Sequence, residues 1–223
     1  MNYGTSFEAW RAAAGETWPA YTRHAFVRGM GDGTLPRAAF LHYLKQDYVF
    51  LIHFARAWAL VVTKAETVAD MRLAAGTVNA LINDELALHI GICAEAGISE
   101  EELIATQERQ ANLAYTRYVL DAGHSGDMLD LLATLAPCVM GYGVIGAELS
   151  ATKTSETYAD WINTYGGEDY QQVCCDVGAL IDGVVARRIG DDPQNCPRWA
   201  NLCDRFHKAT ELEVGFWGMA SQP

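Results

Sequence analysis

The sequence has few features of a metal-bound, disulfide-bonded or β-sheet protein. It contains six cysteines among 223 residues and no Cys-x-x-Cys pair. A structural zinc site and a disulfide scaffold are therefore disfavoured, and the thiols are expected to be reduced. Runs of alternating apolar and polar residues are rare, which argues against strands. The first residues have neither the basic start nor the apolar core of a signal peptide, so we expect the protein in the cytoplasm.

Positive charge is also scarce. Sixteen Lys and Arg residues stand against 28 Asp and Glu residues, which gives a net charge of −12 at pH 7. This charge repels nucleic-acid phosphates and anionic lipids, so neither nucleic acid nor a membrane is expected as a partner. Half of the residues are hydrophobic, and no linker, repeat or low-complexity tract divides the chain. We predict one domain covering residues 1–223.

Apolar residues recur every three or four positions along most of the chain, which is the period of an amphipathic helix. Capping signals at Thr67 and Ser99, a turn cluster over Gly29–Gly33 and a stop at Gly123 mark helix ends. The predicted fold class is therefore all-α, a compact helical bundle. The predicted helices cover residues 7–27, 36–64, 67–95, a short piece near 103, 112–121, 131–147, 156–164, 169–189 and 197–219.

The segment from Leu131 to Ala147 carries no charge and is apolar on every side. Its 17 residues reach about 25 Å as a helix, short of a hydrocarbon core of ~30 Å, so we predict a central buried helix. Pro137 interrupts the hydrogen-bond ladder before Cys138, and Tyr142 follows one turn later. Nearby glycines are expected to leave room for a ligand, at positions 141, 143 and 146. Cys138 is then either a small packed hydrophobe or a nucleophile.

Two carboxylates fall on apolar helix faces. Asp47 shares a face with Tyr43, Phe50 and Phe54. It therefore pairs with an arginine, lies where the helix face turns outward, or accepts hydrogen bonds from a heterocyclic amine that stacks on the rings. Glu213 is nearer than Glu211 to the aromatic face at the end of the chain, because residues two apart cannot share a helix face. Either an exposed glutamate or a buried acid is consistent with that position.

Possible metal ligands are few. Glu85 and His89 lie one turn apart, which suits either a helix-surface hydrogen bond or two ligands on one face. A carboxylate-bridged metal bundle needs a second such motif. His53 and the pair Asp204 and His207 are the remaining candidates. A metal-dependent oxidase or oxygenase is therefore the second hypothesis for the function. The leading hypothesis, described below, involves no metal.

Together, several motifs resemble the TenA proteins, also called thiaminase II or aminopyrimidine aminohydrolases, over nearly the full length. They are Gln-Asp-Tyr-Val-Phe at 46–50, Asn-Leu-Ala-Tyr-Thr-Arg-Tyr at 112–118, Leu-Ala-Pro-Cys-Val-Met-Gly-Tyr at 135–142, Tyr-Ala-Asp-Trp-Ile-Asn-Thr-Tyr at 158–165 and Glu-Val-Gly-Phe-Trp at 213–217. The resemblance implies a fold shared with haem oxygenase and a homotetramer. It also implies a small-molecule pyrimidine substrate and no cofactor.

The resemblance assigns roles to individual residues. Cys138 would add to the pyrimidine ring, Glu213 would donate a proton, and Asp47 would hold the amino group and ring nitrogen. The substrate contacts would be Phe50, Tyr115, Tyr142 and Tyr165. Phe50 departs from the pattern, because many relatives have a tyrosine there, and Tyr48 or Tyr142 would have to supply the missing hydroxyl.

The implied reaction splits the bond between the exocyclic methylene of the pyrimidine and its leaving group. Addition of a thiol dearomatises the ring and expels the leaving group, and water then replaces the cysteine. An acid at neutral pH needs a raised pKa, which burial of Glu213 would give. The substrate would be an aminomethylpyrimidine or thiamine. A third hypothesis is a pyrimidine-binding protein in which Cys138 only packs.

Overall fold

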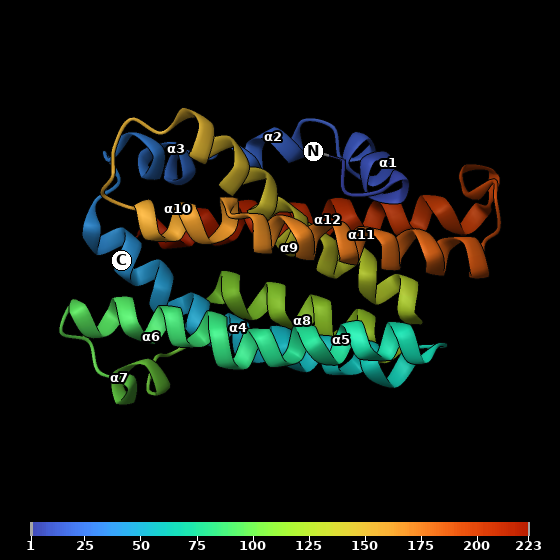
Figure 1. The fold of residues 1–223 in the computed structure, drawn as a ribbon, viewed down its shortest axis with the longest axis horizontal. Helices are drawn as coiled ribbons and strands as arrows, with labels where there is room; N and C mark the ends of the chain where they lie inside the picture. The colour runs from blue at the N-terminus through green and yellow to red at the C-terminus, as the bar shows by residue number, and fades with distance from the viewer. Residues whose placement is uncertain (1, 223) are drawn as a thin grey trace. The chain divides into compact units, whose positions relative to one another are not determined.

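All regular elements of residues 2–222, the part that the computed structural model describes, are helices (Figure 1). The predicted all-α fold class is thus confirmed. The α-helices are α1 Thr5–Ala13, α2 Thr17–Thr22, α3 Ala25–Asp32, α4 Arg37–Lys64, α5 Val68–Ala80, α6 Leu86–Glu95, α7 Glu100–Ile104, α8 Gln110–Ser125, α9 Met128–Thr152, α10 Ala159–Gly166, α11 Glu168–Arg188 and α12 Pro197–Ala220. A π-helical turn, η1, covers Leu81–Glu85, and a 3-10 turn, η2, covers Pro193–Asn195.

The chain forms two compact units, each built from separate stretches of sequence. Unit 1 contains Met1–Leu35 and Leu132–Val214, and unit 2 contains Pro36–Leu131 and Gly215–Pro223. α9 and α12 each contribute residues to both units. The single domain over residues 1–223 stays a prediction.

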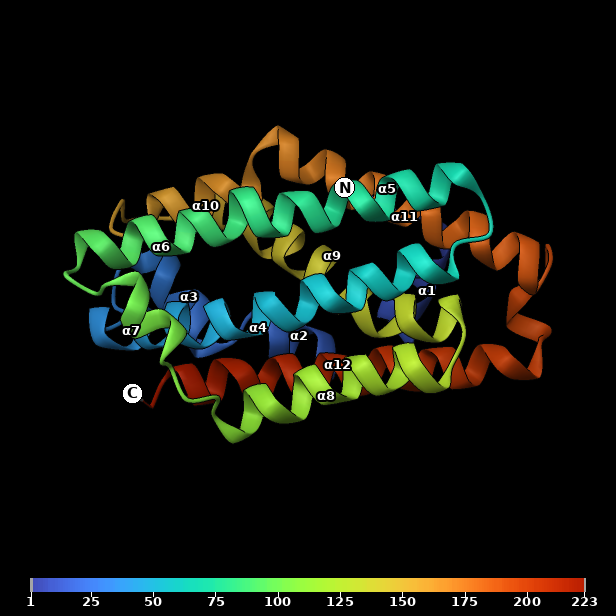
Figure 2. The ribbon, with the colours of Figure 1, turned by 90° about the horizontal axis from the view of Figure 1, so that it is seen from below.

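Unit 2 is organised around α4, against which α5, η1, α6, α7 and α8 all pack. Figure 2 shows α5 and α6 as one long rod beside α4. The rod begins at Thr67, whose hydroxyl oxygen accepts the N–H of Asp70 at 3.1 Å. α7 begins with the reciprocal capping box of Ser99 and Glu102. Both helix starts agree with the capping signals in the sequence.

Unit 1 is held together by rings from helices that are far apart in the sequence. Trp18 of α2 stacks on Phe206 of α12 with ring centroids 5.7 Å apart, and Phe7 of α1 meets Trp18 edge-on at 5.6 Å. Asp182 of α11 accepts the backbone N–H groups of Thr5 and Ser6 at 2.9 and 2.8 Å. This carboxylate supplies the N-cap that α1 lacks from its own residues.

The predicted central helix over residues 131–147 lies inside α9. α9 is long and apolar enough to cross a membrane, but 89% of its most apolar window is buried within the protein. It is therefore a core helix, as predicted. Pro137 lies inside α9 without ending it.

The first predicted helix is wrong in its extent. Residues 7–27 do not form one bent helix, because the chain turns at Gly15, which has φ 53° between α1 and α2. The predicted turn over Gly29–Gly33 is also too wide. Gly29 and Gly31 lie inside α3, and only Gly33, at φ 78°, has the left-handed conformation that ends it.

α8 is longer than predicted, because Gly123 does not end it. A Cβ on Gly123 would lie 2.8 Å from Cδ1 of Leu60, so this glycine lets α8 approach α4 closely. The helix ends at Gly126, whose carbonyl accepts the Nζ of Lys64 at 2.9 Å. Gly123 therefore marks a close approach of two helices, two residues before the last residue of α8, Ser125.

The glycines of α9 do not leave room for a ligand, contrary to the prediction. A Cβ on Gly141 would collide with the ring of Tyr21, and one on Gly143 would lie 2.5 Å from Sγ of Cys174. A Cβ on Gly146 would collide with the backbone of α10, 2.5 Å from the nitrogen of Gly166. The space beside these glycines is therefore filled by neighbouring helices of unit 1.

The Gly146→Ala substitution tests this close approach. Because the opposing atoms belong to the backbone, they cannot move aside as a side chain would, and we expect a loss of about 1–3 kcal/mol in unfolding free energy by urea denaturation. The control is Gly91→Ala in α6, where nothing lies within 4 Å of the added Cβ. There the higher helix propensity of alanine should stabilise by about 0.5–1 kcal/mol. Equal effects of the two substitutions would contradict the packing.

Candidate active site

Asp47 of α4 is a buried carboxylate with only 2% of its surface exposed. Its Oδ2 accepts a hydrogen bond from the hydroxyl of Tyr43 at 3.0 Å and lies 2.7 Å from Nε2 of His89. The expected arginine partner is therefore wrong, and a histidine from α6 takes its place. The described residues offer no hydrogen-bond donor to the other oxygen, Oδ1. Asp47 thus has one oxygen held by the protein and one left to accept a hydrogen bond.

Aromatic rings from three helices of unit 2 surround this part of α4. Phe50 lies with its ring centroid 5.0 Å from Tyr115 of α8 and 5.5 Å from Phe216 of α12. Tyr43 lies 5.2 Å from Trp217. The structure therefore brings together Phe50 and Tyr115, two of the predicted substrate contacts. Rings at these distances and a buried carboxylate form the type of environment that binds a flat heteroaromatic amine.

Tyr48, one of the two residues suggested to replace the hydroxyl that Phe50 lacks, is 7% exposed. Burial and then the charge of Glu100, on α7, raise the pKa of Tyr48. The replacement of that hydroxyl by Tyr48 or Tyr142 stays a prediction.

A second group of predicted residues lies in unit 1, around Cys138 on α9. Cys138 is 8% exposed. The hydroxyl of Tyr21 donates to the carbonyl of Pro137 at 3.3 Å. The carbonyl of Val139 accepts the hydroxyl of Tyr170 at 3.3 Å and the thiol of Cys174 at 3.5 Å. The backbone on both sides of Cys138 is thus fixed by side chains of other helices.

Tyr142 and Tyr165 also meet in unit 1. Their ring centroids are 5.0 Å apart in an edge-on arrangement, and Trp161 lies 4.5 Å from Tyr165. The sequence placed Tyr142 one turn from Cys138, but only the packing of α10 on α9 brings Tyr165 to it. These two tyrosines are therefore close enough to contact a single ring.

Glu213 of α12 is a buried acid, since only 2% of its surface is exposed. Glu211 has 44% of its side chain exposed and pairs with Lys208 and, at 3.5 Å, with His207. The two glutamates point in different directions, as their spacing predicted. The simpler interpretation of Glu213 as an exposed surface residue is wrong.

Glu85 and His89 do not form a pair of metal ligands. Nδ1 of His89 bonds the main-chain carbonyl of Glu85 at 2.9 Å, and Nε2 faces Asp47, so both ring nitrogens are occupied. His53 bonds Arg56 and Arg117, each at 3.3 Å. Within residues 2–222, no cluster of three or more His, Cys, Asp or Glu side chains could hold a metal ion. The sequence singled out His89 but missed its contact with Asp47.

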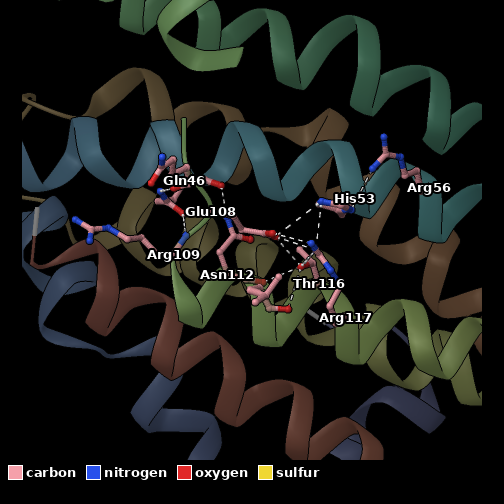
Figure 3. Close-up of polar contacts among 10 residues, drawn as sticks. Gln46, His53, Arg56, Glu108, Arg109, Asn112, Thr116 and Arg117 are labelled. Atoms are coloured by element: carbon pink, nitrogen blue, oxygen red, sulfur yellow. Dashed lines mark hydrogen bonds and ion pairs between the residues drawn. The ribbon is translucent and has the colours of Figure 1, made fainter. Parts of the chain in front are cut away.

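The residue before Asp47 anchors a loop. Gln46 is 2% exposed, and its side chain donates to the carbonyl of Gln107 at 2.9 Å while accepting the N–H of Arg109 at 3.0 Å (Figure 3). Nδ2 of Asn112 donates to the main-chain carbonyl of Gln46 at 2.7 Å. These bonds fasten the connection between α7 and α8 to α4. They fix α4 at the position from which Asp47 projects.

An ion-paired cluster continues this contact along α8. Arg117 donates to both carboxylate oxygens of Glu108 at 2.9 and 2.8 Å, and Thr116 donates to Glu108 at 3.0 Å (Figure 3). A bidentate pair of this kind is geometrically specific. Glu108 is thereby tied to α8, and the loop that carries it holds Gln46.

Comparison with known proteins agrees with the motifs. The sequence profile of the TENA/THI-4/PQQC family matches residues 11–222. A crystal structure described as a TenA family transcription regulator, from Silicibacter sp. TM1040, is 62% identical. The match covers 99% of this chain and 98% of the chain in that crystal structure, with a TM-score of 0.98. A protein of Haemophilus influenzae is 38% identical over 91% of this chain and 92% of its own length.

An aminopyrimidine aminohydrolase of Halalkalibacterium halodurans is 32% identical over 91% of this chain and 89% of its own length. The family match therefore covers both units and nearly all of the helices described above. The resemblance that the motifs predicted is confirmed, and this chain belongs to the TENA/THI-4/PQQC family.

Proposed function

We propose that this chain is an aminopyrimidine aminohydrolase of thiamine salvage. It would convert 4-amino-5-aminomethyl-2-methylpyrimidine and water to the hydroxymethyl pyrimidine and ammonia. The observation that carries the proposal is the buried carboxylate of Asp47, whose Oδ1 is left to accept a hydrogen bond among aromatic rings. Similarity to an aminohydrolase over about nine-tenths of both chains supports the same activity.

Asp47 is suited to hold an aminopyrimidine. Oδ1 can accept a hydrogen bond from the exocyclic amino group of the pyrimidine. A pyrimidine with a carbonyl oxygen at that position could not donate this bond. Phe50 and Tyr115 would contact the ring as stacking or edge partners. Selectivity for the amino group follows, because a buried acceptor left without a donor weakens binding. Tyr142 and Tyr165 are proposed as further substrate contacts.

Cys138 is proposed as the nucleophile and Glu213 as the proton donor. Addition of the thiolate to a ring carbon gives a dearomatised adduct, which expels ammonia from the exocyclic methylene as Glu213 supplies a proton. Water then adds to the methylene and gives a proton back to Glu213, and the ring regains aromaticity as the thiolate leaves. The sum is replacement of an amine by a hydroxyl. The fixed backbone around Cys138 supports this role, because it limits where the sulfur can lie.

Two finer features of the proposal come from the family resemblance. Thiamine would be a second substrate, with its thiazole as the leaving group, and the protein would be a homotetramer. A location in the cytoplasm, which we expect from the sequence, is also part of the proposal. No cofactor takes part in the proposed steps.

A second candidate function is DNA-linked regulation, because a relative with 62% identity is described as a transcription regulator. A net charge of −12 opposes it, since binding to DNA depends on neutralising phosphates with basic side chains. A gel-shift titration at low salt distinguishes the two functions. The hydrolase proposal expects no shift below micromolar protein.

Replacing the thiol tests the nucleophile. Cys138→Ala should lower ammonia release from the aminomethyl pyrimidine by at least about a thousandfold, because no other group forms the covalent adduct. The matched control is Cys196→Ala, which removes a partly exposed thiol and should leave the rate unchanged. Thermal denaturation of both variants checks the fold. Full turnover by the Cys138 variant would sink the mechanism.

Replacing the acid tests the proton donor. Glu213→Gln keeps the size of the side chain but removes the proton, and kcat should fall by about 10²–10⁴. Glu211→Gln is the control on the same helix, because Glu211 is exposed and bound to Lys208. Its kcat should equal that of the unmodified protein. A leaving group with a lower pKa than ammonia should partly restore the rate of the Glu213 variant, and no such recovery would argue against the acid role.

A further inference from the structure

His89 is fully buried, and each of its ring nitrogens has one partner. Nε2 lies 2.7 Å from Oδ2 of Asp47, and Nδ1 lies 2.9 Å from the main-chain oxygen of Glu85. A main-chain oxygen can only accept a hydrogen bond, so Nδ1 must carry a proton. The protonation state of Nε2 then decides the nature of the contact with Asp47.

A proton must lie between Nε2 and Oδ2. At 2.7 Å, a bare Nε2 would place its lone pair against those of the carboxylate, which is repulsive. Either His89 is an imidazolium beside a carboxylate, or a neutral His89 accepts from a protonated Asp47. Burial lowers the pKa of His89, but the hydrogen bond and charge of Asp47, helped by Glu85, outweigh burial and raise it above 6.5. This favours the imidazolium.

The π-helical turn sets the direction in which His89 points. η1 ends where the N–H of Leu86 bonds the carbonyl of Leu81, five residues earlier instead of four. The extra residue rotates everything after it around the helix axis relative to α5. His89 follows one turn later and faces α4. Such turns occur often at functional sites because they re-aim a side chain.

We infer that His89 is a positioning residue for substrate binding. Its imidazolium holds Oδ2 of Asp47 and so leaves Oδ1 as the acceptor for the amino group of a pyrimidine. The inference rests on the proposed function, in which Asp47 binds that amino group. Tyr43 adds a second donor to the same oxygen, which further orients the carboxylate.

Few charges act on this pair. Asp47 and the hydroxyl of Tyr43 face His89 from α4, and Glu85 lies in the turn before it. α7, which also packs against α6, carries the exposed residues Glu100, Glu101 and Glu102. The raised pKa means that the ion pair is present below 6.5 and is lost as the pH rises through the higher folded value. Binding that depends on the pair should weaken over the same alkaline range.

The experiment compares His89→Gln with the unmodified protein across pH. The glutamine amide can donate to Asp47 but carries no charge, so KM should rise by about tenfold or more while kcat changes little. The alkaline rise in KM of the unmodified protein should be absent from the variant. A role in folding alone would lower thermal stability without moving the pH profile. The control is His207→Gln, whose residue is 40% exposed and bonds Thr17 and Glu211.

Two measurements need no variant. The ¹⁵N spectrum of the labelled histidines should show both nitrogens of His89 protonated at pH 6.5, where a free histidine is about half protonated. Titration with the hydroxymethyl pyrimidine should show weaker binding as the pH rises through the range in which His89 loses its proton. A neutral His89 at pH 6.5, or the same pH profile and KM in His89→Gln, overturns the inference.

The outcomes separate the two proposals. If the unmodified protein releases no ammonia but binds the hydroxymethyl pyrimidine with the expected pH dependence, the hydrolase proposal fails and the role of His89 stands. If ammonia is released and His89→Gln behaves as the unmodified protein does, only the role of His89 fails. If the protein does not bind the pyrimidine at all, the role of His89 is overturned as well.

Discussion

The buried contact between Asp47 and His89 is the constraint on which the candidate site in unit 2 depends. A lone carboxylate at 2% exposure would be strongly disfavoured, and removing one partner of a buried pair leaves the other uncompensated. The pair forms only if Asp47 of α4 and His89 of α6 point toward each other. The π-helical turn before α6 gives His89 that direction. Gln46, the next residue on α4, fastens that helix to the loop after α7. The packing of α4 and the position of the Asp47 carboxylate therefore depend on the same set of contacts.

Unit 1 fixes its candidate nucleophile by a different means, with neutral contacts to the main chain. A proline inside a helix removes one N–H and weakens the ladder around it. In α9 the carbonyls of Pro137 and Val139, on either side of Cys138, accept side-chain donors from α2 and α11. These bonds hold a segment that the proline would otherwise loosen. The glycines allow the close approach of those helices, so the same sequence feature serves packing rather than access.

The sequence predicted features that depend on local periodicity and capping. It predicted the all-α class, the burial of α9 and the different directions of Glu211 and Glu213. The predictions failed where contacts between residues far apart in the sequence determine the structure. His89 lies 42 residues from Asp47 in the sequence, and its orientation depends on a π-helical turn that no residue pattern in Leu81–Glu85 announces. Gly123 and Gly146 were interpreted from glycine's usual roles as helix stop or open space, but each is opposed by atoms of another helix.

Phe50 bears on the proposed mechanism, because the family resemblance leads us to expect a tyrosine at this position. Its ring is enclosed by Phe54, Tyr115 and Phe216, with centroids 5.0–5.5 Å away, so this site is built for an apolar group. A hydroxyl there would need a partner of its own. Under the proposed mechanism, proton transfer therefore falls to groups other than residue 50, with Glu213 as the proposed acid.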